Sequence, residues 1–137
     1  MNSDNKPKKP GFENLRIWHK AYELMLEIHA ICKTLPKDER FRLRDQAERS
    51  SSSVVDNLAE AQATYYYNDK IKAAYTARRE TGETQSHLRK MEGFKYISPS
   101  RANLLILRYE ELIRGINAFV NYIARKRELN KNNKNLR

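Results

Sequence analysis

Apolar residues recur every three or four positions along most of the chain, which predicts α-helices rather than strands. In the first predicted helix, over residues 13–34, the apolar positions form two neighbouring stripes. One stripe comprises Leu15, Trp18, Tyr22, Met25, His29 and Cys32, and the other comprises Ile17, Ala21, Leu24, Ile28, Ile31 and Leu35. Together they cover about 200° of the helix surface, more than a helix needs to bury in its own small bundle. The sequence therefore predicts self-association. The expected interface residues are Ile17, Leu24, Ile28 and Ile31.

Three more helices are predicted over residues 37–63, 68–92 and 99–127. Ser98-Pro99 marks the start of the last one, because Ser is a favoured N-cap and Pro a favoured first helical residue. Gly82 lies in the middle of the third helix, where Gly costs about 1 kcal/mol relative to Ala, and we expect a close helix crossing there. Short connections make consecutive helices antiparallel. The predicted fold is all-α, an up-down-up-down antiparallel four-helix bundle.

The second predicted helix has a face of small residues. Ser50, Val54, Leu58 and Ala61 recur at helical spacing. Small side chains allow neighbouring helices to approach closely, and a buried Ser needs a hydrogen-bond partner. This face therefore predicts a specific contact with another helix.

The formal net charge is +10, and much of it lies near the chain ends. Residues 125–137 carry six Lys or Arg against one Glu, a net of +5. We expect a disordered basic arm over residues 1–11, the bundle over 12–128 and a flexible basic tail over 129–137. Such a charge favours an acidic partner, nucleic acid before an anionic membrane. With a polar N-terminus, short apolar runs and one cysteine, we expect a soluble cytoplasmic protein.

The sequence offers little for catalysis. His19, His29 and His87 are too isolated to suggest a metal site, and His29 is interpreted as a hydrogen-bonded core residue. Cys32 lies near a helix C-terminus, where the helix dipole does not activate a thiolate, so we interpret it as a packing residue. There is no phosphate-binding glycine loop and no nucleophile elbow. We therefore predict no enzyme activity, no metal, no cofactor and no small-molecule substrate.

Four groups of residues are candidates for nucleic-acid binding. The C-terminal run contributes Arg125, Lys126, Arg127 and Lys131, the second helix Arg40 and Arg44, and the third helix Lys70, Lys72, Arg78 and Arg79. The fourth group, Tyr65-Tyr66-Tyr67, offers rings on which unpaired bases stack. None of these groups is base-specific, so they predict salt-sensitive binding to phosphates.

Three of these groups also have a structural alternative. The C-terminal cations suit the dipole of a helix end. Acidic residues alternate with the second-helix arginines, which makes a salt-bridged, solvent-exposed face the stronger interpretation there. The tyrosines are more simply explained by one or two rings tucked under the end of the bundle.

Two segments carry a resemblance to a known family. The first is residues 12–21, Phe-Glu-Asn-Leu-Arg-Ile-Trp-His-Lys-Ala, and the second and most specific is residues 53–60, Ser-Val-Val-Asp-Asn-Leu-Ala-Glu. They resemble the small bacterial four-helix-bundle proteins encoded in intervening sequences of large-subunit ribosomal RNA genes. The same superfamily includes the accessory variability determinant proteins of diversity-generating retroelements. Val55, Ala61 and Arg79-Glu80 depart from the common pattern, and they lean toward a basic, partner-specific member.

The resemblance implies a homopentamer without a catalytic site. In the retroelement branch, the pentamer is similar to a basic platform that binds a reverse transcriptase and its template RNA and supports mutagenic cDNA synthesis. This accessory role is our leading hypothesis from the sequence. The alternatives are a protein associated with ribosomal RNA or the ribosome, and an oligomeric scaffold that acts without RNA.

Overall fold

The computed structural model describes residues 11–135, and this part of the chain is all-α. Its elements are a 3-10 turn η2 (Gly11–Asn14), α1 (Arg16–Cys32), a second 3-10 turn η3 (Lys37–Glu39), α2 (Leu43–Ala63), α3 (Tyr67–Gly93) and α4 (Pro99–Asn135). No strand occurs in residues 11–135, as the sequence predicts. Residues 1–10 of the arm expected over residues 1–11, and the last two residues of the expected tail, lie outside the described residues.

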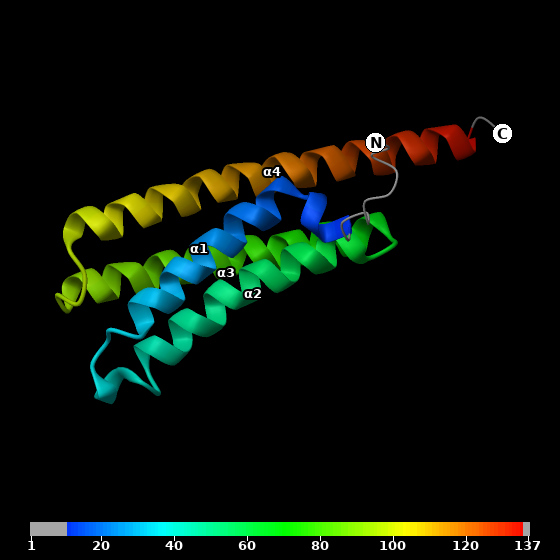
Figure 1. The fold of residues 1–137 in the computed structure, drawn as a ribbon. Helices are drawn as coiled ribbons and strands as arrows, with labels where there is room; N and C mark the ends of the chain where they lie inside the picture. The colour runs from blue at the N-terminus through cyan, green and yellow to red at the C-terminus, as the bar shows by residue number, and fades with distance from the viewer. Residues whose placement is uncertain (1–10, 136–137) are drawn as a thin grey trace, which may run out of the picture.

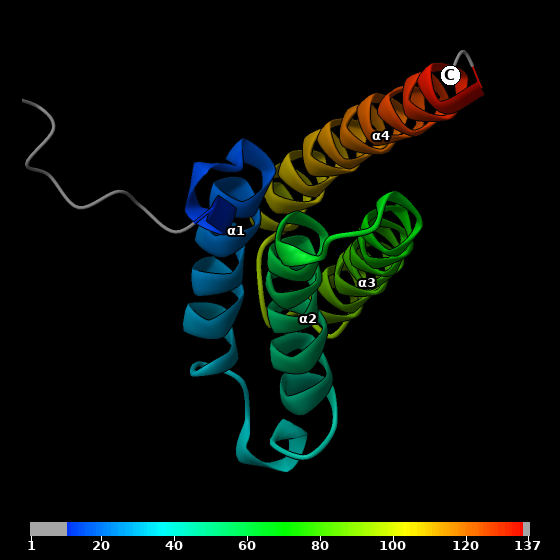
Figure 2. The same ribbon diagram turned by 90° about the vertical axis from the view of Figure 1, so that its right-hand side faces the viewer.

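The four helices pack side by side around one core (Figures 1 and 2). α2 packs against both α1 and α3, and α4 packs against α3 and less extensively against α1. The largest fully buried side chains include Leu24, Ile28, Leu58, Leu88, Met91, Leu105, Tyr109, Leu112 and Ile116. Every helix supplies at least one of them, so the core is shared by the whole bundle.

The small face of α2 makes the contact that the sequence predicts. Ser50 is fully buried, and its Oγ lies 2.8 Å from Oγ1 of Thr84 in α3. Ala47 and Ala61 on α2 and Ala74 and Ala77 on α3 are also fully buried. These short side chains bring the two helices close enough for a hydroxyl to bridge them, so the hydrogen bond fixes one arrangement of α2 against α3.

The assignment of the two α1 stripes is wrong. Ile17, Leu24, Ile28 and Ile31, expected at an oligomer interface, are 8%, 1%, 0% and 4% exposed and lie in the chain's own core. In the neighbouring stripe, Tyr22 is 39% exposed and the other side chains are half-buried, except Cys32, which is fully buried. Two adjacent apolar stripes have the same periodicity, so the spacing alone does not show which one turns inward.

The close helix crossing lies at a different glycine. A Cβ atom at Gly82 would meet nothing within 4 Å, so the crossing expected there is absent. A Cβ atom at Gly115 in α4 would come 2.7 Å from Cγ2 of Ile17 in α1. Gly115 is therefore the residue that permits α1 to rest against α4.

The helix ends differ from the predicted ones in two places. α2 begins at Leu43 rather than at residue 37, because residues 37–39 form a 3-10 turn and Arg42 has φ −118° and ψ −106°, outside the helical region. α4 continues to Asn135, so most of the segment expected to be a flexible tail is helical. Extending an existing helix requires no new nucleation, and cations near its C-terminus suit the helix dipole.

Candidate nucleic-acid interface

The last turns of α4 extend past the rest of the bundle. Figure 1 shows α4 running over the α2–α3 connection and continuing beyond it. Residues 121–135 contain five Lys or Arg and one Glu, a net of +4. The end of α4 therefore carries a net positive charge.

The same end contains a groove of about 440 Å³. We name it the tyrosine groove; it is lined by Tyr65, Tyr66, Tyr67, Asn68, Arg127, Asn130 and Lys131. It joins two groups that lie about 60 positions apart in the sequence, the tyrosine triplet and part of the C-terminal cations. Antiparallel packing of α3 and α4 brings them together, since the start of α3 meets the end of α4.

Two of the three tyrosine rings face solvent. Tyr65 is 85% exposed and Tyr66 67% exposed, while Tyr67 is half-buried. The rings of Tyr65 and Tyr66 contact each other edge to face, with centroids 5.0 Å apart. The alternative in which one or two rings tuck under the bundle therefore applies only to Tyr67.

The backbone that carries these rings is firmly held. Only residues 64–66 separate α2 from α3, and the N–H of Thr64 donates to the carbonyl of Glu60. Lys70 Nζ donates to the carbonyl oxygens of Ala61 and Gln62 at 3.2 and 2.9 Å. Lys70 was expected to bind nucleic acid; it instead satisfies the free carbonyls at the end of α2.

Burial and the nearby positive charge of Lys126 lower the pKa of Lys70. Its ammonium group thus lies in a region that is already positive. Lys126 itself lies 4.7 Å from the ring centroid of Tyr122. A cation over an aromatic face remains charged and accessible to a phosphate.

Arg127 and Lys131 face the groove from α4. Arg127 NH1 donates to Oδ1 of Asn68 at 2.9 Å, which ties the end of α4 to the start of α3. Both cations also lie near Glu128, at 3.4 and 3.9 Å. These are exposed ion pairs, which contribute little to stability and exchange readily for a phosphate.

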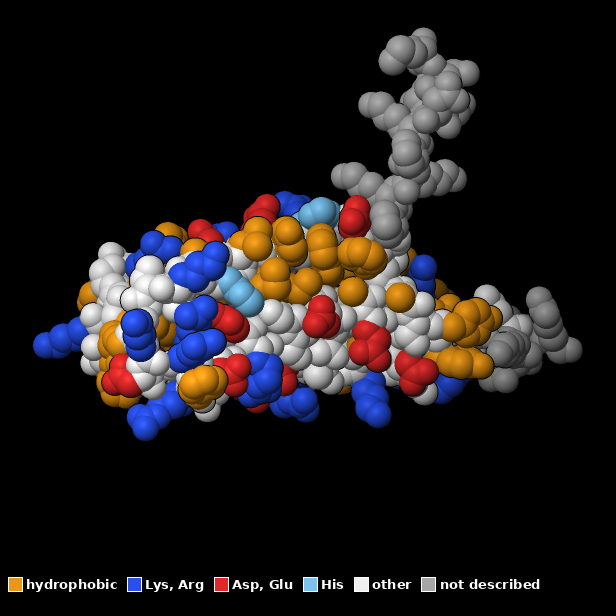
Figure 3. Space-filling model, turned by 60° about the horizontal axis from the view of Figure 1, so that its bottom comes forward, with side chains coloured by type: hydrophobic (Ala, Val, Ile, Leu, Met, Phe, Trp, Pro, Cys, Tyr) orange, Lys and Arg blue, Asp and Glu red, His pale blue; other side chains and the backbone are white. Residues whose placement is uncertain are grey.

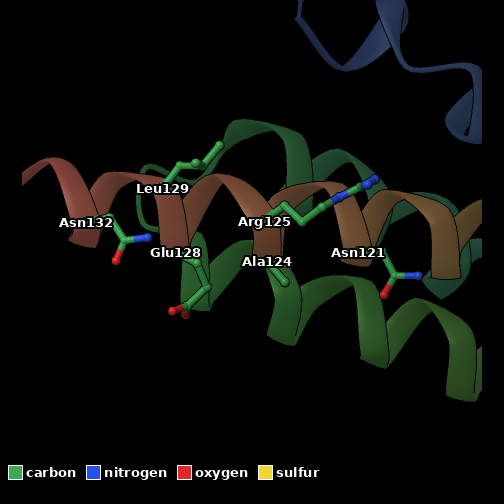
Figure 4. A pocket seen from close by; sticks show the side chains of 6 residues that line it. All are labelled: Asn121, Ala124, Arg125, Glu128, Leu129 and Asn132. Atoms are coloured by element: carbon green, nitrogen blue, oxygen red, sulfur yellow. The ribbon is translucent and has the colours of Figure 1, made fainter.

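Arg125 lies on the opposite side of α4. It lines a shallow hollow with Asn121, Ala124, Glu128, Leu129 and Asn132, all from α4 (Figure 4). The contiguous C-terminal run is therefore divided between two faces of one helix. Consecutive residues are about 100° apart on an α-helix, so this division follows from the sequence spacing.

The α3 arginines do not join this end. Arg78 NH1 donates to Oδ1 of Asn117 at 2.9 Å and lies over the ring of Tyr75 at 4.8 Å. Arg79 is exposed and lies 3.9 Å from Glu80. Lys72 is exposed on the same helix. Arg78 therefore serves the α3–α4 contact, whereas Arg79 and Lys72 face solvent.

Arg40 and Arg44 lie at the other end of the bundle, beside the α1–α2 connection. With Lys33, Leu35, Lys37 and Phe41 they line a second hollow, which we name the basic corner. Arg44 Nε pairs with Glu48 at 2.9 Å, as the salt-bridged alternative predicts. Lys33 and Lys37 are not among the cations predicted from the sequence, although five cations within residues 33–44 signal such a cluster.

Two further residues of α1 have structural roles. His29 Nε2 lies 3.1 Å from Ser52 Oγ, so the expected hydrogen bond is present, but His29 is half-buried and lies outside the core. Burial raises the pKa of Cys32 to about 12, so its thiol is protonated at neutral pH. Across residues 11–135, no three His, Cys, Asp or Glu side chains gather closely enough to hold a metal ion. No helix in this range is long and apolar enough to cross a membrane.

Comparison with known proteins adds a family and a structural relative. The sequence model of the family described as 23S rRNA-intervening sequence protein matches residues 13–118. A crystal structure of a protein of unknown function from the S23 ribosomal protein family of Bacteroides thetaiotaomicron VPI-5482 is similar, with a TM-score of 0.71 and 22% identity. The similarity covers 77% of this chain and 95% of that one, and it supports the fold alone. No curated protein matches.

Proposed function

Because the chain belongs to the 23S rRNA-intervening sequence protein family, we propose that it is a non-catalytic RNA-binding protein. The observation that carries this proposal is the positive end of α4, where five cations and one carboxylate occur within residues 121–135. Arg125, Lys126, Arg127 and Lys131 lie on different sides of the helix, so an RNA strand contacts several of them by wrapping around its end. Phosphate contacts of this kind give affinity without sequence preference.

Salt dependence tests this proposal. On a single strand, each phosphate that a cation neutralises contributes about −0.7 to the slope of log K against log salt. Changing Arg125, Lys126 and Arg127 to Gln is therefore expected to reduce the slope by about 2. The measurement is fluorescence anisotropy of a labelled single-stranded RNA at several KCl concentrations.

A matched control removes the same charge elsewhere. Lys90, Lys95 and Arg101 are exposed near the α3–α4 connection, at the opposite end of α4. Changing these three to Gln is expected to leave the slope unchanged. Equal effects of the two triple variants would show that only total charge matters, and would refute a site on α4.

For the partner, we propose a reverse transcriptase of a diversity-generating retroelement with its template RNA, an accessory role in mutagenic cDNA synthesis. The resemblance of residues 53–60 and the charge of α4 support this proposal. Ribosomal RNA is the second candidate, and the name of the matching family favours it. Affinity purification from the native cells, with and without ribonuclease, separates the two. Recovery of a reverse transcriptase with one discrete RNA supports the first, and co-sedimentation with ribosomes supports the second.

We also propose that the protein self-associates, as a homopentamer by the resemblance. The support is an accessible apolar surface on α1, which we name the α1 outer face: Leu15, Trp18, Tyr22, Met25 and Leu26. The rings of Trp18 and Tyr22 stack at 5.1 Å, and Leu26 is 50% exposed. Figure 3 shows hydrophobic side chains gathered into one patch on this side of the molecule. Contiguous patches of this kind commonly mark protein interfaces.

Light scattering tests self-association. Tyr22→Glu combined with Leu26→Glu is expected to yield monomers, while Glu substitutions at exposed polar positions leave the oligomer intact. A stable oligomer without affinity for RNA at physiological salt would instead favour the RNA-independent scaffold.

A further inference from the structure

We propose that the tyrosine groove binds an unpaired base of single-stranded RNA. This inference rests on the proposed RNA-binding function and adds the class of RNA that the site selects. Phosphate contacts alone do not select unpaired bases, and so do not make a protein prefer a single strand to a duplex.

Tyr65 and Tyr66 supply the stacking surface of the groove. Tyr65 and Tyr66 leave most of their surface in water, although an aromatic ring is stabilised by burial. They stand on a connection of three residues between two helices, which Lys70 ties down from α3. Because this connection is already held in place, stacking a base on the rings requires little additional ordering of the protein. The rings are therefore prepared for a flat ligand.

The charge of the groove suits a nucleic acid. Arg127 and Lys131 line the groove, and no carboxylate does so among the described residues. Asn68 and Asn130 add amide groups that both donate and accept hydrogen bonds, as base edges do. The first turn of α3 starts beside Tyr66, whose side chain does not cap it. Its free N–H groups favour a negative group such as a phosphate.

The size and openness of the groove suit an unpaired base. The groove, about 440 Å³, has a size typical of small-ligand sites and is open at the bundle end. In a duplex the bases are stacked on each other and do not reach such rings. Single-stranded RNA presents its bases, and stacking on aromatic side chains is largely independent of sequence. The groove is therefore expected to favour single strands over duplexes.

The test compares two RNAs of equal length and label, an unstructured single strand and a duplex. Tyr65→Ala combined with Tyr66→Ala is expected to weaken single-strand binding about 5- to 150-fold, the effect of losing one stacked base. Duplex binding is expected to change less than twofold. Tyr65→Phe combined with Tyr66→Phe keeps the rings and is expected to retain single-strand binding. Thermal melting of both variants checks that the exposed substitutions leave the fold intact.

The outcomes separate this inference from the proposed function. If the wild type binds neither RNA, the RNA-binding function is refuted and the groove with it. If the wild type binds RNA with the expected salt dependence but the Ala variant loses nothing, or loses both RNAs equally, only the base-binding groove is refuted. Crosslinking of single-stranded RNA containing 5-bromouridine gives an independent readout, and adducts on Tyr65 or Tyr66 are the expected result.

Discussion

Gly115→Ala and Gly82→Ala make the same chemical change in two helices with opposite expected effects on stability. At Gly82 the added methyl meets nothing within 4 Å, so only helix propensity changes, and the free energy of unfolding is expected to rise by about 0.5–1 kcal/mol. At Gly115 the methyl would lie 2.7 Å from Cγ2 of Ile17, well inside van der Waals contact. Ile17 is only 8% exposed and has little space to move aside. Overpacking of a core costs about 1–3 kcal/mol.

The comparison removes the propensity term, because both variants gain it. Gly115→Ala is therefore expected to be less stable than Gly82→Ala by about 1–3 kcal/mol. Urea unfolding followed by circular dichroism measures both values, at one fixed protomer concentration because association would contribute to stability.

Ile17→Ala supplies the control. It removes Cγ2, so Gly115→Ala should cost much less in that background than in the wild type. Gly115→Ala as stable as Gly82→Ala, or an equal cost in both backgrounds, would refute the close approach of α1 to α4 at this point.

Three further predictions concern buried polar groups. The hydroxyl of Tyr109 is buried without a hydrogen-bond partner among the described residues, so Tyr109→Phe is expected to stabilise the protein by about 1 kcal/mol in urea unfolding; a loss of stability would reveal a partner. Burial lowers the pKa of His87, so the neutral form is favoured in the folded state, and stability is expected to fall as the pH drops below 6.5 through the folded-state pKa. Burial also raises the pKa of Glu80, which opposes this trend. Comparing the wild type with His87→Phe across the same pH range isolates the contribution of the histidine. Identical dependence of stability on pH in the two proteins would contradict this assignment. Cys32, with a pKa of about 12, is expected to resist thiol reagents until the protein unfolds, and rapid labelling of the native protein would contradict its burial.

Helical periodicity accounts for most of what the sequence predicted. The four helices, the Ser50 contact, the hydrogen bond of His29 and the burial of Cys32 follow from residues three or four positions apart on one helix. Such spacing defines a face but not the element that covers it. That is why the two α1 stripes were exchanged and why the close crossing was placed at Gly82 instead of Gly115.

The tyrosine groove shows a second limit. The sequence identified Tyr65 and Tyr66 as stacking candidates and Arg127 and Lys131 as phosphate contacts, but as separate features. Only the packing of α3 against α4, and the continuation of α4 past residue 128, place them in one groove. Asn68 and Asn130 gave no signal, since surface Asn residues are ordinary until their neighbours are known.

The position of the groove relative to the α1 outer face leads to a prediction about avidity. If copies associate through this face into a ring whose symmetry axis runs along the bundles, the bundle axes run in the same sense and every tyrosine groove lies at the same end of the ring. A long RNA then contacts several grooves at once, whereas a short RNA fills a single groove. Linked sites of this kind raise affinity by about 10²–10⁴ without new contacts.

The monomeric variant, Tyr22→Glu with Leu26→Glu, separates these two effects. It is expected to bind a short single-stranded RNA as tightly as the wild type, because the groove is intact. It is expected to bind a long RNA about 10²–10⁴ times more weakly, because only one groove is engaged. Equal losses for both RNAs would mean that the α1 outer face itself contacts RNA. No loss for either would mean that each bundle binds RNA independently, and that the apolar face of α1 serves another partner.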